Sequence, residues 1–238
     1  MESTVQPLAP DLFHVRLPSG NSHLLNCYLW RGADGVTVVD TGWPGWALHI
    51  EAALHEIGAG RGDVSRIILT HFHADHVGSA AEIASWSSPE VVAGPVDADI
   101  VRGGQAGPRP ELTEAEVALA PTMQGDDAPP AACRVDREVG DGDRLGPSGE
   151  ITVLHGPGHT EGSIALHWPD LGVLLTGDTL AEFEGNVILG AFNLDRVATR
   201  ASADRLAGLG ADTVGFGHGD PVLNGGSRRL RDVTDPLG

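Results

Sequence analysis

Three histidines and an aspartate lie within six positions of the segment THFHADHVG, residues 70–78, and this cluster constrains the fold more than any other feature. The apolar run SRIILT, residues 65–70, leads directly into it and predicts a short buried strand. Imidazoles and carboxylates are poor core material, because buried polar groups must find partners. The cluster is therefore expected to be either a solvated loop at a strand end or a shell around a positive charge.

Three further polar residues each follow an apolar run and are flanked by glycine. They are His159 in HGPGHTEGS, Asp178 in LLTGDTL and His218 in VGFGHGDP. Taken singly, each suits a structural role at the end of a strand. Taken with the cluster, they supply five His and two Asp, which is enough for two metal ions.

The order of apolar runs predicts an α/β fold. Two groups of strands, each followed by helices, indicate two β-sheets packed face to face with helices outside. The polar clusters then fall past the carboxyl ends of strands, where open α/β sheets present ligand sites. Strands are expected at 11–18, 23–31, 35–42, 65–70, 90–94, 133–139, 150–155, 163–168, 172–178 and 211–220, and helices at 43–60, 78–86, 199–210 and 225–233.

The length of 238 residues favours a single domain over residues 1–238. Residues 103–132 differ from the rest, because they carry several prolines and acids. They are interpreted as an inserted lid or surface segment. One short helix is expected there, with Thr113 and Glu116 as its capping box and Pro121 as its end.

The charge balance excludes several classes of partner. A formal net charge of −18, from 15 basic and 33 acidic residues, repels nucleic acid and anionic membrane surfaces. All the basic residues are Arg, so Schiff-base chemistry through Lys is excluded. The sequence also shows neither a signal-peptide pattern nor an apolar stretch of membrane-spanning length. These features predict a cytoplasmic enzyme with a small-molecule substrate and leave the oligomeric state open.

The motifs resemble those of the metallo-β-lactamase-fold hydrolase superfamily. The HxHxDH block is preceded by VVDTG and followed by PGHT, TGD and GHG, from about residue 12 to about residue 220. The resemblance implies a four-layer αβ/βα fold and a dinuclear metal site. It assigns His71, His73 and His159 to one ion, Asp75, His76 and His218 to the other, Asp178 to a bridge between them, and Asp40 to orienting the ligand loop.

The implied chemistry is hydrolysis of an ester-type bond. Two Zn²⁺ ions are favoured by the imidazole ligands, with iron or manganese as alternatives. A hydroxide shared by the two ions would attack an acyl carbon, and Asp75 would orient it and carry a proton. Asp178 at the bridging position resembles the lactonase, thioesterase and glyoxalase II-like branches, because β-lactamases of this fold usually place Cys or Ser there.

Three alternatives stay open at this point. One is a mononuclear iron enzyme resembling persulfide dioxygenases, which would use His71, His159 and Asp178. The others are a β-lactam hydrolase and a non-catalytic binding module, the last of which the complete ligand set disfavours. Three side chains outside the ligand set are candidate substrate contacts, namely His23, Phe183 and Phe192.

Overall fold

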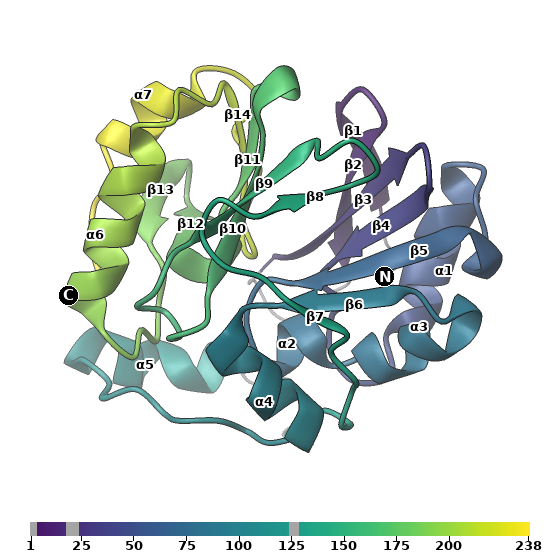
Figure 1. Ribbon diagram of the computed structural model, residues 1–238. Coiled ribbons are helices and arrows are strands. Elements are labelled where there is room, and N and C mark those ends of the chain that lie inside the picture. Colours follow the sequence, from purple (N-terminus) through teal and green to yellow (C-terminus); the bar gives the residue numbers. More distant parts are fainter. Residues whose placement is uncertain (1–3, 18–23, 124–128) are drawn as a thin grey trace.

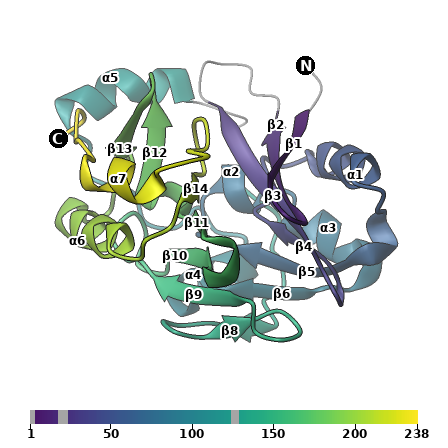
Figure 2. The same cartoon turned by 90° about the horizontal axis from the view of Figure 1, so that it is seen from above.

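Two mixed β-sheets pack face to face, with helices on their outer sides (Figures 1 and 2). The computed structural model describes residues 4–17, 24–123 and 129–238. The first sheet is antiparallel from β1 to β4 and parallel from β4 to β7. Its strands, in spatial order, are β1 (Thr4–Ala9), β2 (Leu12–Leu17), β3 (Leu25–Gly32), β4 (Gly35–Val39), β5 (Val64–Leu69), β6 (Glu90–Ala93) and β7 (Arg137–Glu138).

The second sheet has the spatial order β14-β11-β10-β9-β8. Only the pair β11 and β14 is parallel. These strands are β8 (Arg144–Leu145), β9 (Ile151–His155), β10 (Ile164–Trp168), β11 (Val173–Leu175) and β14 (Thr213–Gly215). A separate antiparallel hairpin consists of β12 (Leu180–Phe183) and β13 (Asn186–Leu189).

Helices cover the outer side of each sheet, as Figure 1 shows. The first sheet carries α1 (Ala47–Glu56), α2 (Ala74–Val77), α3 (Ala80–Ser87) and α4 (Pro95–Gly103), and the second carries α6 (Arg196–Ala207) and α7 (Gly226–Arg231). The helix α5 (Glu114–Met123) lies beside the hairpin and the C-terminal segment in both views (Figures 1 and 2). None of the described helices is long and apolar enough to cross a membrane.

The central strands are buried on both faces, which explains their unbroken apolar runs. In β5, Ile67 packs into the core between the first sheet and its helices, whereas Ile68 packs into the core between the sheets. Both side chains are fully buried. In β10, Ala165 packs into the core between the second sheet and its helices, and Leu166 packs into the core between the sheets. The predicted α/β architecture with four layers is therefore confirmed.

Some predicted elements are wrong in extent. Pro121 lies inside α5 and does not end it, because in the last turn its ring removes only one backbone hydrogen bond. The capping box of that helix is as predicted, since Thr113 N–H donates to Glu116 and Glu116 N–H donates to Thr113. Of the strand predicted at 133–139, only Arg137–Glu138 forms one.

Several elements have no counterpart in the prediction, among them β1, α4 and the two strands of the β12–β13 hairpin. Strand β1 contains Pro7 and buries little, so it lacks the usual alternation of apolar residues. Helix α4 begins with Pro95 at a position where the missing N–H costs nothing. The turn of the hairpin lies at Glu184 and Gly185, both with positive φ.

Candidate metal centre

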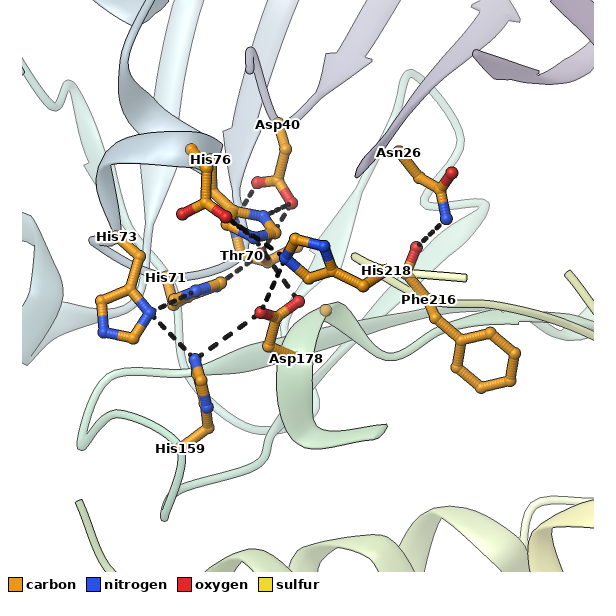
Figure 3. A network of polar contacts seen from close by, with 12 residues as sticks. Asn26, Asp40, Thr70, His71, His73, His76, His159, Asp178, Phe216 and His218 are labelled. Atoms are coloured by element: carbon orange, nitrogen blue, oxygen red, sulfur yellow. Dashed lines mark hydrogen bonds and ion pairs between the residues drawn. The ribbon is translucent and has the colours of Figure 1, made fainter. Parts of the chain in front are cut away.

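The seven candidate ligands meet where loops leave the carboxyl ends of strands from both sheets (Figure 3). The loop after β5 carries His71 and His73, and the short helix α2 that continues it carries Asp75 and His76. The second sheet supplies the other three from the loops after β9, β11 and β14, namely His159, Asp178 and His218. We call these seven side chains the metal-ligand floor.

The first group in the floor is a triangle of imidazoles. His71 Nε2 and His159 Nε2 each lie 3.0 Å from His73 Nδ1. Burial together with His159 lowers the pKa of His73 to about 3, and burial together with neighbouring imidazoles lowers the pKa of His71 well below its usual value. These rings are therefore neutral at pH 7 and available as ligands.

The hydrogen bonds of Thr70 fix which nitrogen of His71 carries the proton. Thr70 Oγ1 donates its only proton to Asp40 Oδ2 over 2.8 Å and lies 3.0 Å from His71 Nδ1. The hydroxyl can then only accept from His71, so Nδ1 is protonated and Nε2 presents a lone pair to the other imidazoles. A neutral imidazole held in this tautomer is the form that binds a metal ion.

The second group consists of Asp75, His76 and His218. Asp75 Oδ2 lies 3.2 Å from His218 Nε2 and 3.7 Å from His76 Nε2. Although burial opposes ionisation, His76 and His218 lower the pKa of Asp75 to about 2. Burial would lower the pKa of His218, but Asp178 and Asp75 raise it to about 9. Without a metal ion, Asp75 is therefore ionised and His218 holds a proton, which a metal ion bound at its Nε2 would have to displace.

Asp178 lies between the two groups. Its Oδ1 is 3.4 Å from His76 Nε2, and its Oδ2 is 3.4 Å from His218 Nε2 and 3.8 Å from His159 Nε2. Despite burial, His76 and His218 hold the pKa of Asp178 well below its usual value. A permanently ionised carboxylate in contact with both groups is suited to bridging two cations.

The donor set fits metal ions better than protons. Among the residues that the structure describes, His76 Nε2 and Asp178 Oδ1 are buried without a hydrogen-bond partner. Three subsets each bring one nitrogen or oxygen per residue within 4.8 Å of one another: His71, His73 and His159; His71, His76 and Asp178; and Asp75, His76 and His218. A cation would satisfy the lone pairs that proton sharing leaves unpaired.

Asp40 lies where the resemblance places it, at the end of β4, and has a positive φ of 59°. It accepts hydrogen bonds from the backbone N–H and the hydroxyl of Thr70, each 2.8 Å long. His76 Nδ1 donates to it over 2.9 Å. One carboxylate thus sets the orientation of His76 directly and that of His71 through Thr70.

A second buried carboxylate, Asp97, has no counterpart in the sequence-based prediction. It lies in the first turn of α4 and is 1% exposed. Its Oδ2 accepts from Phe72 N–H over 3.0 Å and from the Thr160 hydroxyl over 2.7 Å, and its Oδ1 accepts from Gly162 N–H over 2.8 Å. Asp97 therefore joins the loop of His71 and His73 to the loop of His159. The only signal in the sequence is an isolated acid after Gly94 and Pro95.

Gly217 lies directly before the last candidate ligand, His218, at a position where no side chain fits. A Cβ at this position would overlap Asp178 Oδ1 and crowd the ring of His76. The backbone before His218 can therefore pass behind the carboxylate only as glycine.

The metal-ligand floor opens into a cavity of about 310 Å³. Five of the seven candidate ligands line it, and the remaining lining is mostly apolar. Phe183 and Phe192, two candidate substrate contacts, are in this lining, as is Leu119 of the 103–132 segment. The third candidate, His23, lies outside the described residues.

The comparisons with known proteins agree with this geometry. The family model described as "Metallo-beta-lactamase superfamily" matches residues 23–218. A hydroxyacylglutathione hydrolase of Cereibacter sphaeroides is 32% identical over 119 residues, which are 49% of this chain and 34% of the relative. The match thus spans about a third of the length of that relative.

Two further relatives cover more of the chain. An acyl-coenzyme A thioesterase of Bos taurus is 30% identical over 191 residues, covering 71% of this chain and 62% of the relative. The crystal structure of a metallo-beta-lactamase family protein from Thermus thermophilus superimposes with a TM-score of 0.67 and 29% identity, covering 95% of this chain and 79% of the other.

Proposed function

Because the chain belongs to the metallo-beta-lactamase superfamily, we propose that it is a metal-dependent hydrolase that cleaves an ester-type bond, such as a lactone or thioester, with two zinc ions in the metal-ligand floor. The observation that carries the proposal is the convergence of two ligand groups around Asp178 at the base of a mostly apolar cavity. The zinc assignment is supported by the five imidazoles of the floor, because imidazole is a ligand that suits zinc.

The residues divide the work of hydrolysis among them. His71, His73 and His159 would hold one ion, and Asp75, His76 and His218 the other, with Asp178 shared. When bound, such ions supply a Lewis acid and lower the pKa of water enough to give a nucleophile at neutral pH. The balanced reaction adds the water oxygen to the acyl carbon, breaks the C–O or C–S bond and gives a proton to the leaving atom.

Asp75 is suited to handling that proton. It lines the cavity, and its Oδ2 is held 3.2 Å from His218 Nε2, so one of its carboxylate oxygens has a fixed direction. Ionised at pH 7, it can orient the attacking water, accept its proton and pass it to the leaving oxygen or sulfur. The apolar lining around it excludes bulk water and strengthens these electrostatic interactions.

Two observations favour ester-type bonds over the alternatives. Two of the relatives are named for the hydrolysis of hydroxyacylglutathione and of acyl-coenzyme A, and both of these compounds are acyl thioesters. The mononuclear iron alternative uses only His71, His159 and Asp178, and it leaves the second ligand group of Asp75, His76 and His218 without a role.

A panel of substrates tests the proposal. Zinc-loaded protein is incubated with a lactone, a neutral acyl thioester, an aryl ester and a β-lactam. Asp75→Ala protein with equal zinc content serves as the control. We expect turnover of the ester-type substrates that is lost in the variant. Turnover of the β-lactam alone, or of none of the four by protein with both ions bound, would contradict the proposal.

A further inference from the structure

The cavity above the metal-ligand floor has an apolar lining built from separate parts of the chain. Trp43 follows β4, Leu119 lies on α5, and Phe183 and Ile188 come from the β12–β13 hairpin. Phe192 follows the hairpin, and Leu237 comes from the C-terminal segment. We call these six side chains the apolar wall.

Outside the metal-ligand floor, the described lining of the cavity offers no cation for an anionic group. Among the described residues that line it there is no Arg, and the chain contains no Lys. Beyond the candidate ligands, the charged side chain in the lining is Glu182, whose two carboxylate oxygens accept backbone N–H groups of Gly185 and Asp220. An anionic substituent placed against this part of the lining, away from the floor, would lose its hydration and find no positively charged partner.

From this lining we propose that the apolar wall binds an uncharged, apolar acyl chain, so that the substrates are neutral acyl esters or thioesters whose acyl group points into the cavity. The inference rests on the proposed hydrolase function and names the substrate class of the same site. It excludes acyl groups that end in a carboxylate, because that charge would lie against the apolar wall.

An ionic cluster behind the wall holds its parts together. Glu116 of α5 is 1% exposed and lies 2.9 Å from Arg196 Nη1, and its Oε1 also accepts from Phe192 N–H over 2.8 Å. Arg196 makes two more hydrogen bonds, of 2.9 and 3.0 Å, to Asp235. Thr113, which caps α5, donates to the backbone carbonyl of Leu237 over 2.6 Å.

This cluster makes the apolar wall a fixed surface. It ties together α5 with Leu119, the segment with Phe192 and the C-terminal segment with Leu237. The guanidinium of Arg196 is fully engaged by two carboxylates, so it is not free to bind a substrate anion in the cavity. The wall therefore favours an apolar chain.

A matched series of substrates tests the inference on zinc-loaded, full-length protein. The p-nitrophenyl esters of acetate, butanoate, hexanoate and octanoate vary only in chain length, and in mono-p-nitrophenyl suberate a carboxylate replaces the terminal methyl group of the octanoyl chain. We expect kcat/KM to rise about fourfold per added methylene, the gain from burying it. We expect the suberyl ester to be at least about a hundredfold poorer than the octanoyl ester.

Two variants of α5 assign the effect to the apolar wall. Leu119→Arg places a cation in the wall, so it should lower kcat/KM for the octanoyl ester and raise it for the suberyl ester. Val117→Arg adds the same charge on the same helix, at a side chain that is 58% exposed. It should change kcat/KM for neither the octanoyl nor the suberyl ester by more than about twofold. Equal kcat/KM for acetyl and octanoyl esters, or for octanoyl and suberyl esters, would overturn the inference.

A binding measurement separates this inference from the proposed function. Calorimetry measures the affinity of zinc-loaded protein for butanamide, hexanamide and octanamide, which are neutral and need no cleavage. If the affinity rises with chain length but the protein hydrolyses no ester, the result would support acyl-chain binding by the apolar wall and contradict the proposed function. Hydrolysis with amide affinity independent of chain length would sustain the function and overturn the inference.

Discussion

The metal-ligand floor and the apolar wall, which meet in one cavity, hold their side chains in different ways. In the floor, buried carboxylates outside the ligand set fix the ligand loops, as Asp40 does through Thr70 and His76. In the wall, the side chains that face the cavity are apolar, and one ionic cluster around Arg196 lies behind them. The contrast teaches that chemistry and selectivity are built separately here, so that each can be changed without the other.

The largest expected effect is the loss of proton handling in the floor. Asp75→Asn keeps the shape of the side chain but cannot accept a proton, so kcat/KM for the octanoyl ester should fall about 10²–10⁴-fold. Its ratio of octanoyl to acetyl hydrolysis should stay as in the wild type, because the apolar wall is intact. Steady-state kinetics on protein with matched zinc content gives both values, and a loss below about tenfold would remove Asp75 from its proposed role.

Metal removal should destabilise the floor specifically. The folded protein binds the ions through residues that the unfolded chain does not hold together, so each bound ion should add about 2.7 kcal/mol of stability when free zinc is at 100 times the Kd of its site. Thermal unfolding with and without a chelator measures this difference. A transition temperature that does not depend on zinc would show that the seven side chains do not form a metal site.

Asp97 tests whether the loops of the floor depend on a carboxylate outside the ligand set. Asp97→Asn keeps one acceptor oxygen and turns the other into an NH2 donor, so the N–H of either Phe72 or Gly162 loses its acceptor and the two ligand loops are no longer joined by one carboxylate. We expect zinc affinity or activity to fall about 10–100-fold. Asp99→Asn is the matched control, because this neighbour on α4 has an 84% exposed side chain.

The mildest prediction concerns the ionic cluster behind the wall. Glu116→Gln removes the charge that Arg196 and Phe192 N–H contact, and should lower the free energy of unfolding by about 1–3 kcal/mol. Hydrolysis of the octanoyl ester should fall more than that of the acetyl ester, since only the longer chain reaches the wall. Glu114→Gln, at an exposed position on the same helix, should leave both unchanged. Equal losses of kcat/KM for both esters would show that the ionic cluster does not contribute to the selection of the longer chain.

The floor was accessible to sequence reasoning because its residues recur as motifs at strand ends. The HxHxDH block, His159, Asp178 and His218 each follow an apolar run, and the carboxyl ends of such strands meet in space. Asp97 was not predicted because it belongs to no motif, and its role depends on contacts with loops distant in the chain.

The apolar wall was only partly accessible, and for a physical reason. Phe183 and Phe192 are among the contacts predicted from the sequence, but Leu119 and Leu237 are not, because a single leucine carries no signal of a binding role. They reach the cavity through tertiary contacts such as the hydrogen bond from Thr113 to Leu237. Such contacts between distant segments cannot be predicted from local sequence patterns.

The most direct test of the account is a zinc titration of the metal-free protein in which bound metal and hydrolysis of the octanoyl ester are followed together. The account predicts saturation at two ions per chain, full activity only when both are bound, and loss of one ion in His73→Ala or His218→Ala protein. Activity in the metal-free protein, or full activity with one ion that survives the loss of His73 and of His218, would contradict it.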